Sequence, residues 1–81
     1  MNIVVDVRTT EEFADGHLEG SINIPLNEVP ERVEEFKQMK QPITLVCKSG
    51  YRSGEATSYL KQFGIECENG GGWTDLLEDK K

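Results

Sequence analysis

A cysteine ends a short apolar run and is followed at once by a polar loop. The run is Ile43–Val46, and the loop reads Cys47-Lys48-Ser49-Gly50-Tyr51-Arg52-Ser53. If the run is a strand and a helix follows the loop, Cys47 lies exposed where backbone N–H groups and a helix N-terminus favour an anion. Such a field, with Lys48 and Arg52 nearby, lowers the pKa of a thiol. The pattern predicts a nucleophilic thiolate at neutral pH.

The alternative for Cys47 is a structural role, because free cysteine is among the residues most often buried. Two features favour the reactive role. Lys48 and Arg52 place cations on both sides of the loop, and Gly50 frees the backbone to curl around a ligand. Tyr51, at the loop tip, can project to solvent or meet an acceptor molecule. We therefore take Cys47 as the candidate nucleophile and the residues after it as the candidate anion site.

The length and charge of the chain narrow the possible functions. Its 81 residues make one small domain with a thin core. The net charge is −6, with 9 basic and 15 acidic residues, which opposes binding to nucleic acid or to an anionic membrane. We expect a monomer whose local positive spot, Lys48 and Arg52, attracts a small anion.

Targeting and cysteine usage lead to further expectations. No apolar run is long enough to cross a bilayer, and no basic leader precedes Ile3. We expect a cytoplasmic protein, or a mature chain from which a signal peptide was removed. Two cysteines, Cys47 and Cys67, are too few for a disulfide framework, so reduced thiols are expected. One histidine and two distant cysteines give no zinc spacing, so no metal is expected.

Apolar runs alternate with helical patterns, which predicts βαβ units and a mainly parallel sheet. Strands are expected at 3–7, 22–24, 43–46 and 65–67, and helices after Thr9, from Asn27 to about Met39, along Ala56, Tyr59, Leu60 and Phe63, and from Trp73 to Asp79. Thr9 and Glu12 form a capping-box pattern. Gly70–Gly72 predicts a tight, exposed loop. Ligands of such sheets bind outside the carboxyl ends of the strands, which is where Cys47 is expected.

Several motifs, taken in order, resemble the rhodanese family. The first half carries Asp6-Val7-Arg8, Glu12-Phe13 and Gly16-His17-Leu18-Glu19-Gly20-Ser21-Ile22-Asn23-Ile24-Pro25. The loop 47–53 resembles the active-site loop of the family, and Gly71-Gly72 with Trp73 resembles its closing signature. The resemblance runs from about residue 3 to residue 77. It implies one rhodanese-like domain over residues 1–81, a small three-layer α/β fold with a mainly parallel sheet of about four strands and helices on both faces. The resemblance also implies that the strand and helix that usually come first in the family are lacking.

The resemblance also implies an activity, that of a thiosulfate sulfurtransferase (rhodanese)-type enzyme. Such an enzyme moves a sulfane sulfur from thiosulfate or a persulfide donor to a thiophilic acceptor, such as cyanide, a small thiol or a protein thiol. Cys47 would carry the sulfur as a covalent persulfide, without a bound cofactor. The amides of residues 48–53 would surround the sulfur, and Lys48 and Arg52 would hold the anionic donor. Some thiosulfate-specialised members carry an extra arginine where this chain has Glu12, which argues against high thiosulfate affinity.

Other functions stay open beside this one. Cysteine-dependent phosphatases place five residues between cysteine and arginine, whereas four separate Cys47 from Arg52. An arsenate reductase-like enzyme is a related alternative. A non-catalytic binding module on the same fold is a third, although such modules commonly lose the cysteine. A nucleotide-binding loop is weaker, because the chain has no Gly-x-x-x-x-Gly-Lys-Ser/Thr pattern.

The remaining candidate residues have structural interpretations. Asp6 and Arg8 are expected to form an internal charge pair beneath the active loop. His17 is expected to cap backbone carbonyls rather than to catalyse. Cys67 could resolve a persulfide on Cys47, but its strand position favours partial burial. Trp73 is expected to fill the core, since aromatic side chains bury large areas.

Overall fold

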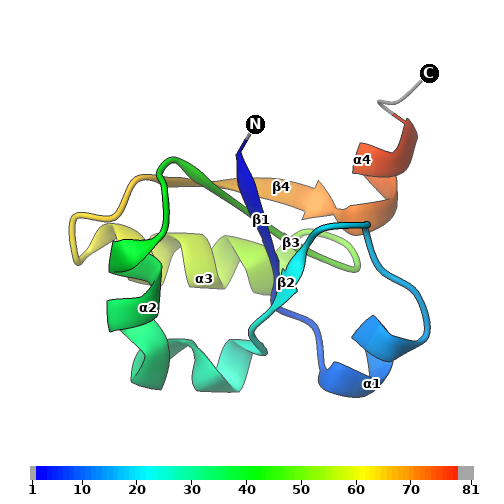
Figure 1. Ribbon diagram of the computed structural model, residues 1–81, viewed down its shortest axis with the longest axis horizontal. Coiled ribbons are helices and arrows are strands. Elements are labelled where there is room, and N and C mark those ends of the chain that lie inside the picture. Colours follow the sequence, from blue (N-terminus) through cyan, green and yellow to red (C-terminus); the bar gives the residue numbers. More distant parts are fainter. Residues whose placement is uncertain (1, 79–81) are drawn as a thin grey trace.

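The structure, a computed structural model, describes residues 2–78. Four strands alternate with helices along the chain (Figure 1). The elements are β1 (Ile3–Asp6), α1 (Thr10–Ala14), β2 (Ile22–Asn23), the 3₁₀ helix η1 (Leu26–Arg32), α2 (Val33–Gln38), β3 (Ile43–Cys47), α3 (Tyr51–Lys61), β4 (Cys67–Gly72) and α4 (Trp73–Glu78). Asp79, where the last helix was expected to end, lies outside the described residues.

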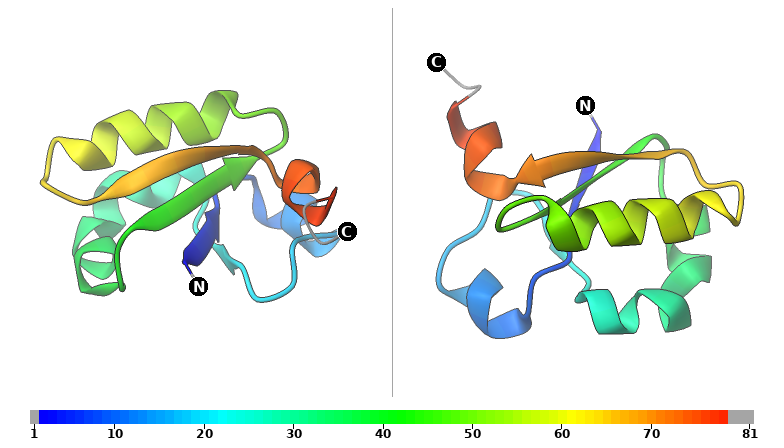
Figure 2. Two further views of the ribbon diagram at one scale, coloured as in Figure 1. Left: turned by 90° about the horizontal axis from the view of Figure 1, so that it is seen from above. Right: turned by 180° about the vertical axis from the view of Figure 1, so that it is seen from behind.

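The sheet has four strands in the order β2-β1-β3-β4, and every neighbouring pair is parallel. All five residues of β3 are buried, as expected for a central strand covered on both faces. Figure 1 and the right-hand view of Figure 2 show α3 below β4 and α4 above the end of β4. The predicted three-layer α/β fold with a four-stranded parallel sheet is confirmed.

The core lies between the sheet and one layer formed by η1, α2 and α3. Its buried members include Val5, Val7, Ile24, Val29, Phe36, Ile43, Leu45, Ala56, Leu60 and Ile65. Ala56 and Leu60 sit one helical turn apart on α3, and both have no exposed surface. Phe63 does not continue this stripe, because α3 ends at Lys61 and the side chain of Phe63 is 43% exposed.

The segment before β3 differs from the single helix expected from Asn27. It forms η1 with Pro30 inside, and α2 begins only at Val33. Proline has no N–H to donate to the carbonyl four residues back, and its ring crowds that carbonyl, so a regular α-helix cannot run through Pro30. Val29 and Phe36 are nevertheless both buried, so the apolar face of the segment is as expected.

The glycines near the C-terminus were wrongly expected to form an exposed loop. They belong to β4, whose register against β3 shifts at Gly70, so that Leu45 faces Asn69 while Val46 faces Gly71. This is a β-bulge. A Cβ on Gly70 would lie 2.6 Å from a methyl carbon of Thr44, and one on Gly72 would lie 2.6 Å from the Lys48 carbonyl oxygen. The glycines therefore permit close approach between β4, β3 and the loop after Cys47.

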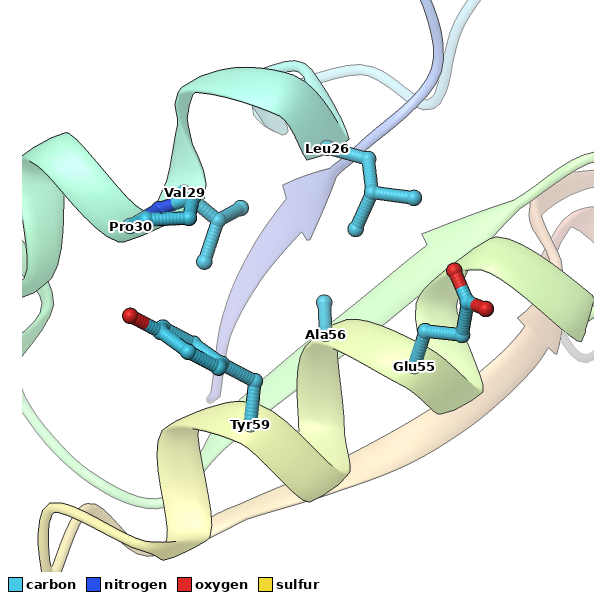
Figure 3. Close-up of a pocket in the computed structure, with 6 residues that line it drawn as sticks. All are labelled: Leu26, Val29, Pro30, Glu55, Ala56 and Tyr59. Atoms are coloured by element: carbon cyan, nitrogen blue, oxygen red, sulfur yellow. The ribbon is translucent and has the colours of Figure 1, made fainter.

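An apolar cleft of about 250 Å³ opens between η1 and α3. Figure 3 shows Leu26 and Val29 of η1 pointing into it opposite Ala56 and Tyr59 of α3. Glu55 is the one charged residue of its lining, and no residue of the loop 47–53 contributes. The cleft therefore has nothing to attract an anion.

Candidate active site

Cys47 is the last residue of β3, at the carboxyl end of the central strand. Its side chain is 1% exposed, so the expectation of an exposed position was wrong. The physical reason is that the cysteine belongs to the strand, while the residues after it fold over the sulfur into the first turn of α3. The sulfur thus lies beneath a layer of backbone rather than at the tip of the loop.

Three hydrogen-bond donors meet the Cys47 sulfur. Gly50 N is 3.0 Å from Sγ, Ser53 N is 3.4 Å away, and Ser53 Oγ is 3.3 Å away. Gly50 has φ +98° and is the N-cap of α3. Only glycine adopts this left-handed conformation without strain, and it turns the first free amides of the helix toward the sulfur. Of the expected amide cradle, the structure places the amides of Gly50 and Ser53 within 3.4 Å of Sγ, and the Ser49 amide also acts on the sulfur.

The surroundings of Cys47 act on its pKa in opposite directions. Burial is the largest single influence and raises the pKa of the Cys47 thiol. Hydrogen bonds from the Ser53 hydroxyl and from the backbone amides of Ser53, Ser49 and Gly50 lower it, and together they prevail. The pKa of Cys47 therefore lies below the ordinary value for cysteine, in the predicted direction.

Alkylation kinetics test this shift. In a Cys67→Ser variant, the rate of reaction of Cys47 with iodoacetamide should rise with pH and reach its midpoint below about 8.5, the value for free cysteine. The thiolate is the reacting form, so a lowered pKa moves the whole curve to lower pH. The same variant unfolded in urea is the control, and its midpoint should return to the free value. A folded midpoint at or above the unfolded one would contradict the hydrogen-bond argument.

Arg52, expected to be free for an anionic donor, is already paired with a carboxylate. Its Nη1 donates to Glu12 Oε1 at 2.8 Å, and its Nη2 donates to Glu12 Oε2 at 3.2 Å. The hydrogen bond from Arg52, followed by that from the Thr9 amide, lowers the pKa of Glu12 to about 2. The predicted positive spot is therefore partly neutralised, while Lys48 remains exposed. Sequence reasoning missed this because the partners are 40 residues apart.

Asp6 and Arg8 form the expected charge pair in the interior. Arg8 Nη2 lies 2.8 Å from Asp6 Oδ2, and the two side chains are 6% and 0% exposed. Arg8 also donates to the carbonyl of Gly16 at 2.8 Å, and its guanidinium lies 4.7 Å from the ring centroid of Trp73. Trp73 is only half-buried and covers this cation, rather than filling the core as expected.

His17 and Cys67 take the places that their structural interpretations predict. The Nδ1 of His17 is 2.7 Å from the carbonyl oxygen of Phe13, and the two rings stack. Cys67 is buried, and burial raises the pKa of its thiol. Cys67 pairs with Ile43 at the start of β3, whereas Cys47 ends that strand. The rise along β3 from Ile43 to Cys47 is roughly 13 Å. Cys67, which lies beside Ile43, is therefore too far from Cys47 to attack a sulfur on it.

Asn69 is a site residue that the sequence did not reveal. Its Oδ1 accepts from Ser53 Oγ at 2.6 Å, and its Nδ2 donates to the Gly50 carbonyl at 2.9 Å. Its sequence context, Glu-Asn-Gly, is typical of a loop. Only the register of β4 against β3 places it beside the Cys47 loop.

Neither a metal-binding cluster nor a membrane-spanning helix is found among the described residues. Within residues 2–78, no cluster of three or more His, Cys, Asp or Glu side chains is arranged to hold a metal ion. In the same part of the chain, no helix is both long enough and apolar enough to cross a membrane.

Comparison with known proteins identifies the family. The sequence profile of the rhodanese-like domain matches residues 1–78. The thiosulfate sulfurtransferase PspE of Escherichia coli is 37% identical over 78 residues, which cover 94% of this chain and 75% of that protein. A crystal structure of a rhodanese-like domain protein from Staphylococcus aureus superposes with a TM-score of 0.83 at 32% identity, over 93% of this chain and 72% of that one.

A rhodanese with anions from E. coli superposes with a TM-score of 0.81 at 35% identity, over 93% of this chain and 91% of that one. The names of these relatives support a sulfurtransferase function. The match of the family profile over almost the whole sequence agrees with the order of motifs from Asp6 to Trp73. This chain belongs to the rhodanese-like domain family.

Proposed function

We propose that this protein is a sulfurtransferase that carries a sulfane sulfur on Cys47 as a persulfide. One observation carries the proposal. The sulfur of Cys47 lies at the carboxyl end of the central strand, within 3.0 to 3.4 Å of three donors from Gly50 and Ser53. Such donors stabilise a thiolate and, after transfer, hold the inner sulfur in place. The names of two relatives, a thiosulfate sulfurtransferase and a rhodanese, support the same proposal.

Loading begins with the Cys47 thiolate. It attacks the outer sulfur of a donor such as thiosulfate, and a new S–S bond forms while the donor's own bond to that sulfur breaks. The electron pair of the broken bond leaves with the donor, as sulfite from thiosulfate or as a thiolate from an alkyl persulfide. Cys47 is left as a persulfide, and no external oxidant or reductant is needed. The lowered pKa of Cys47 increases the share of the thiolate, which is the nucleophilic form.

In the second step the outer sulfur passes from Cys47 to an acceptor. A thiophilic acceptor, cyanide or a thiolate, attacks the outer sulfur, and Cys47 leaves as a thiolate that the same donors stabilise. Tyr51 is 78% exposed at the start of α3, beside the loop. An exposed aromatic ring at this place can contact an acceptor, including a protein thiol. We therefore propose that Tyr51 contributes to acceptor choice.

The Glu12–Arg52 pair should govern the affinity for an anionic donor. Glu12→Gln removes a negative charge and releases Arg52, so KM for thiosulfate is expected to fall by about 2- to 10-fold. Glutamine can still accept the hydrogen bond from Thr9 N, so the cap of α1 should survive. Arg52→Ala is the matched change in the opposite direction and should raise KM. An unchanged or higher KM in Glu12→Gln would show that the donor does not contact Arg52.

Parallel assays separate the proposal from its nearest rival. The wild-type protein should transfer sulfur from thiosulfate to cyanide and should not hydrolyse aryl phosphates. Four residues between Cys47 and Arg52 make a shorter loop than the five of cysteine-dependent phosphatases. Phosphate release without thiocyanate formation would overturn the sulfurtransferase proposal and favour a phosphatase.

A further inference from the structure

The side chain of Asn69 connects β4 to both ends of the Cys47 loop. Its Oδ1 accepts from Ser53 Oγ at 2.6 Å and from Gly71 N at 3.0 Å, and its Nδ2 donates to Gly50 O at 2.9 Å. A backbone N–H can only donate and a backbone carbonyl can only accept. The partners at Gly71 and Gly50 therefore fix the amide orientation, with its oxygen toward Ser53.

The Ser53 hydroxyl lies between two acceptors but has a single proton. Its Oγ is 2.6 Å from Asn69 Oδ1 and 3.3 Å from Cys47 Sγ. While Cys47 is a thiol, the S–H group can donate to Oγ, and the Ser53 proton can stay in the short bond to Asn69. Once the thiol proton has passed to water, the thiolate is a charged acceptor. Hydrogen bonds to charged groups are stronger, so the hydroxyl turns toward the sulfur.

We propose that Asn69 is a positioning residue that competes with the Cys47 sulfur for the proton of the Ser53 hydroxyl. Ionisation of Cys47 then breaks the Ser53–Asn69 hydrogen bond, and Asn69 favours the protonated thiol. The direction of the hydroxyl follows the charge on the sulfur. In the persulfide of the proposed function the inner sulfur is again uncharged, so the hydroxyl returns to Asn69.

Other charges near Cys47 do not replace this contact. The charged residues at the loop and in contact with it are Lys48, Arg52, Glu12, Asp6, Arg8 and Asp75, and the same elements also carry Glu11, Glu55, Lys61 and Glu68. Arg52 is held by Glu12, Asp6 is held by Arg8, and Asp75 accepts from the Gly72 amide. Among the hydrogen bonds of residues 2–78, none joins these side chains to the Ser53 hydroxyl. Substitution of Asn69 therefore leaves them in place.

A double-mutant cycle measures the competition. Asn69→Ala and Ser53→Ala, singly and together in the Cys67→Ser background, are titrated by the pH dependence of iodoacetamide alkylation. With Ser53 present, Asn69→Ala frees the hydroxyl for the sulfur. Asn69→Ala should therefore lower the pKa of Cys47 more, or raise it less, when Ser53 is present than when position 53 is alanine. The difference between these two shifts should be about 0.5 to 1 pH unit, the equivalent of one hydrogen bond. Ser58→Ala, on an exposed part of α3, is the control and should shift nothing.

Asn69→Asp gives a second variant of nearly the same shape. Its carboxylate is a stronger acceptor, so it should raise the pKa of Cys47, and by more when Ser53 is present than when Ser53 is alanine. Equal shifts with and without Ser53 in either variant would overturn the proposal and leave Asn69 a purely structural support of Gly50. Alkylation needs no sulfur donor, so this outcome is independent of whether the protein transfers sulfur.

Discussion

Replacement of Cys47 by serine is expected to abolish sulfur transfer while the fold stays intact. The change removes the one atom that accepts the sulfur, and a hydroxyl is not ionised at neutral pH, so kcat/KM for thiosulfate:cyanide transfer should fall by at least about a thousandfold. Serine is slightly smaller than cysteine and can accept from the same Gly50 and Ser53 donors. The thermal midpoint should therefore change little. Both quantities are measured on the same preparation.

Cys67→Ser is the matched control for this experiment. Its side chain is buried at the other end of the sheet, near the start of β3, where it contacts the carbonyl of Thr57. The variant should keep most of its activity. Substantial sulfur transfer by Cys47→Ser would eliminate the persulfide mechanism, and a collapse of turnover in Cys67→Ser would restore a catalytic role for the second cysteine.

Asp6→Ala is expected to cause the largest loss of stability. The carboxylate of Asp6 is fully buried and accepts from both the backbone amide and the guanidinium of Arg8. Its removal leaves a buried cation without its partner, which typically costs about 3–5 kcal/mol of unfolding free energy. Small domains have about 5–15 kcal/mol in total, so much of the stability is at risk. Urea denaturation measures the change.

A surface ion pair provides the comparison for Asp6. Lys37 and Glu34 are 3.4 Å apart on α2, with side chains 43% and 79% exposed. Glu34→Ala should cost far less than Asp6→Ala, because water screens the pair. The double variant Asp6→Ala with Arg8→Met should recover part of the loss, since no unpaired charge remains. Equal losses of unfolding free energy in Glu34→Ala and Asp6→Ala would contradict the argument that burial makes the Asp6–Arg8 pair important for stability.

The parts of the fold that follow from local chemistry were predictable. The apolar run ending at Cys47 is a strand because its side chains are β-branched or apolar and covered on both faces. Thr9 and Glu12 form the expected capping box at the start of α1. Pro30 was a visible signal against a continuous helix from Asn27, and it could have corrected that expectation.

The parts that depend on distant segments were not predictable. Gly70 and Gly72 lie in β4, which pairs with β3, and Thr44 and the Lys48 carbonyl leave no room for a Cβ at these positions. A sequence does not display these contacts. The position of Asn69 depends on the bulge in β4, since a register shift changes which face a side chain occupies. The pairing of Glu12 with Arg52 likewise arises only when α1 packs beside the first turn of α3.

The mass of the intact protein after incubation with thiosulfate tests the central claim most directly. We expect a gain of about 32 Da, one sulfur atom, which disappears on addition of cyanide or dithiothreitol. Cys47→Ser should gain nothing under the same conditions, while Cys67→Ser should gain the same mass as the wild-type protein. Absence of the gain with thiosulfate and with an alkyl persulfide, or a gain that persists in Cys47→Ser, would contradict the assignment of Cys47 as the sulfur carrier.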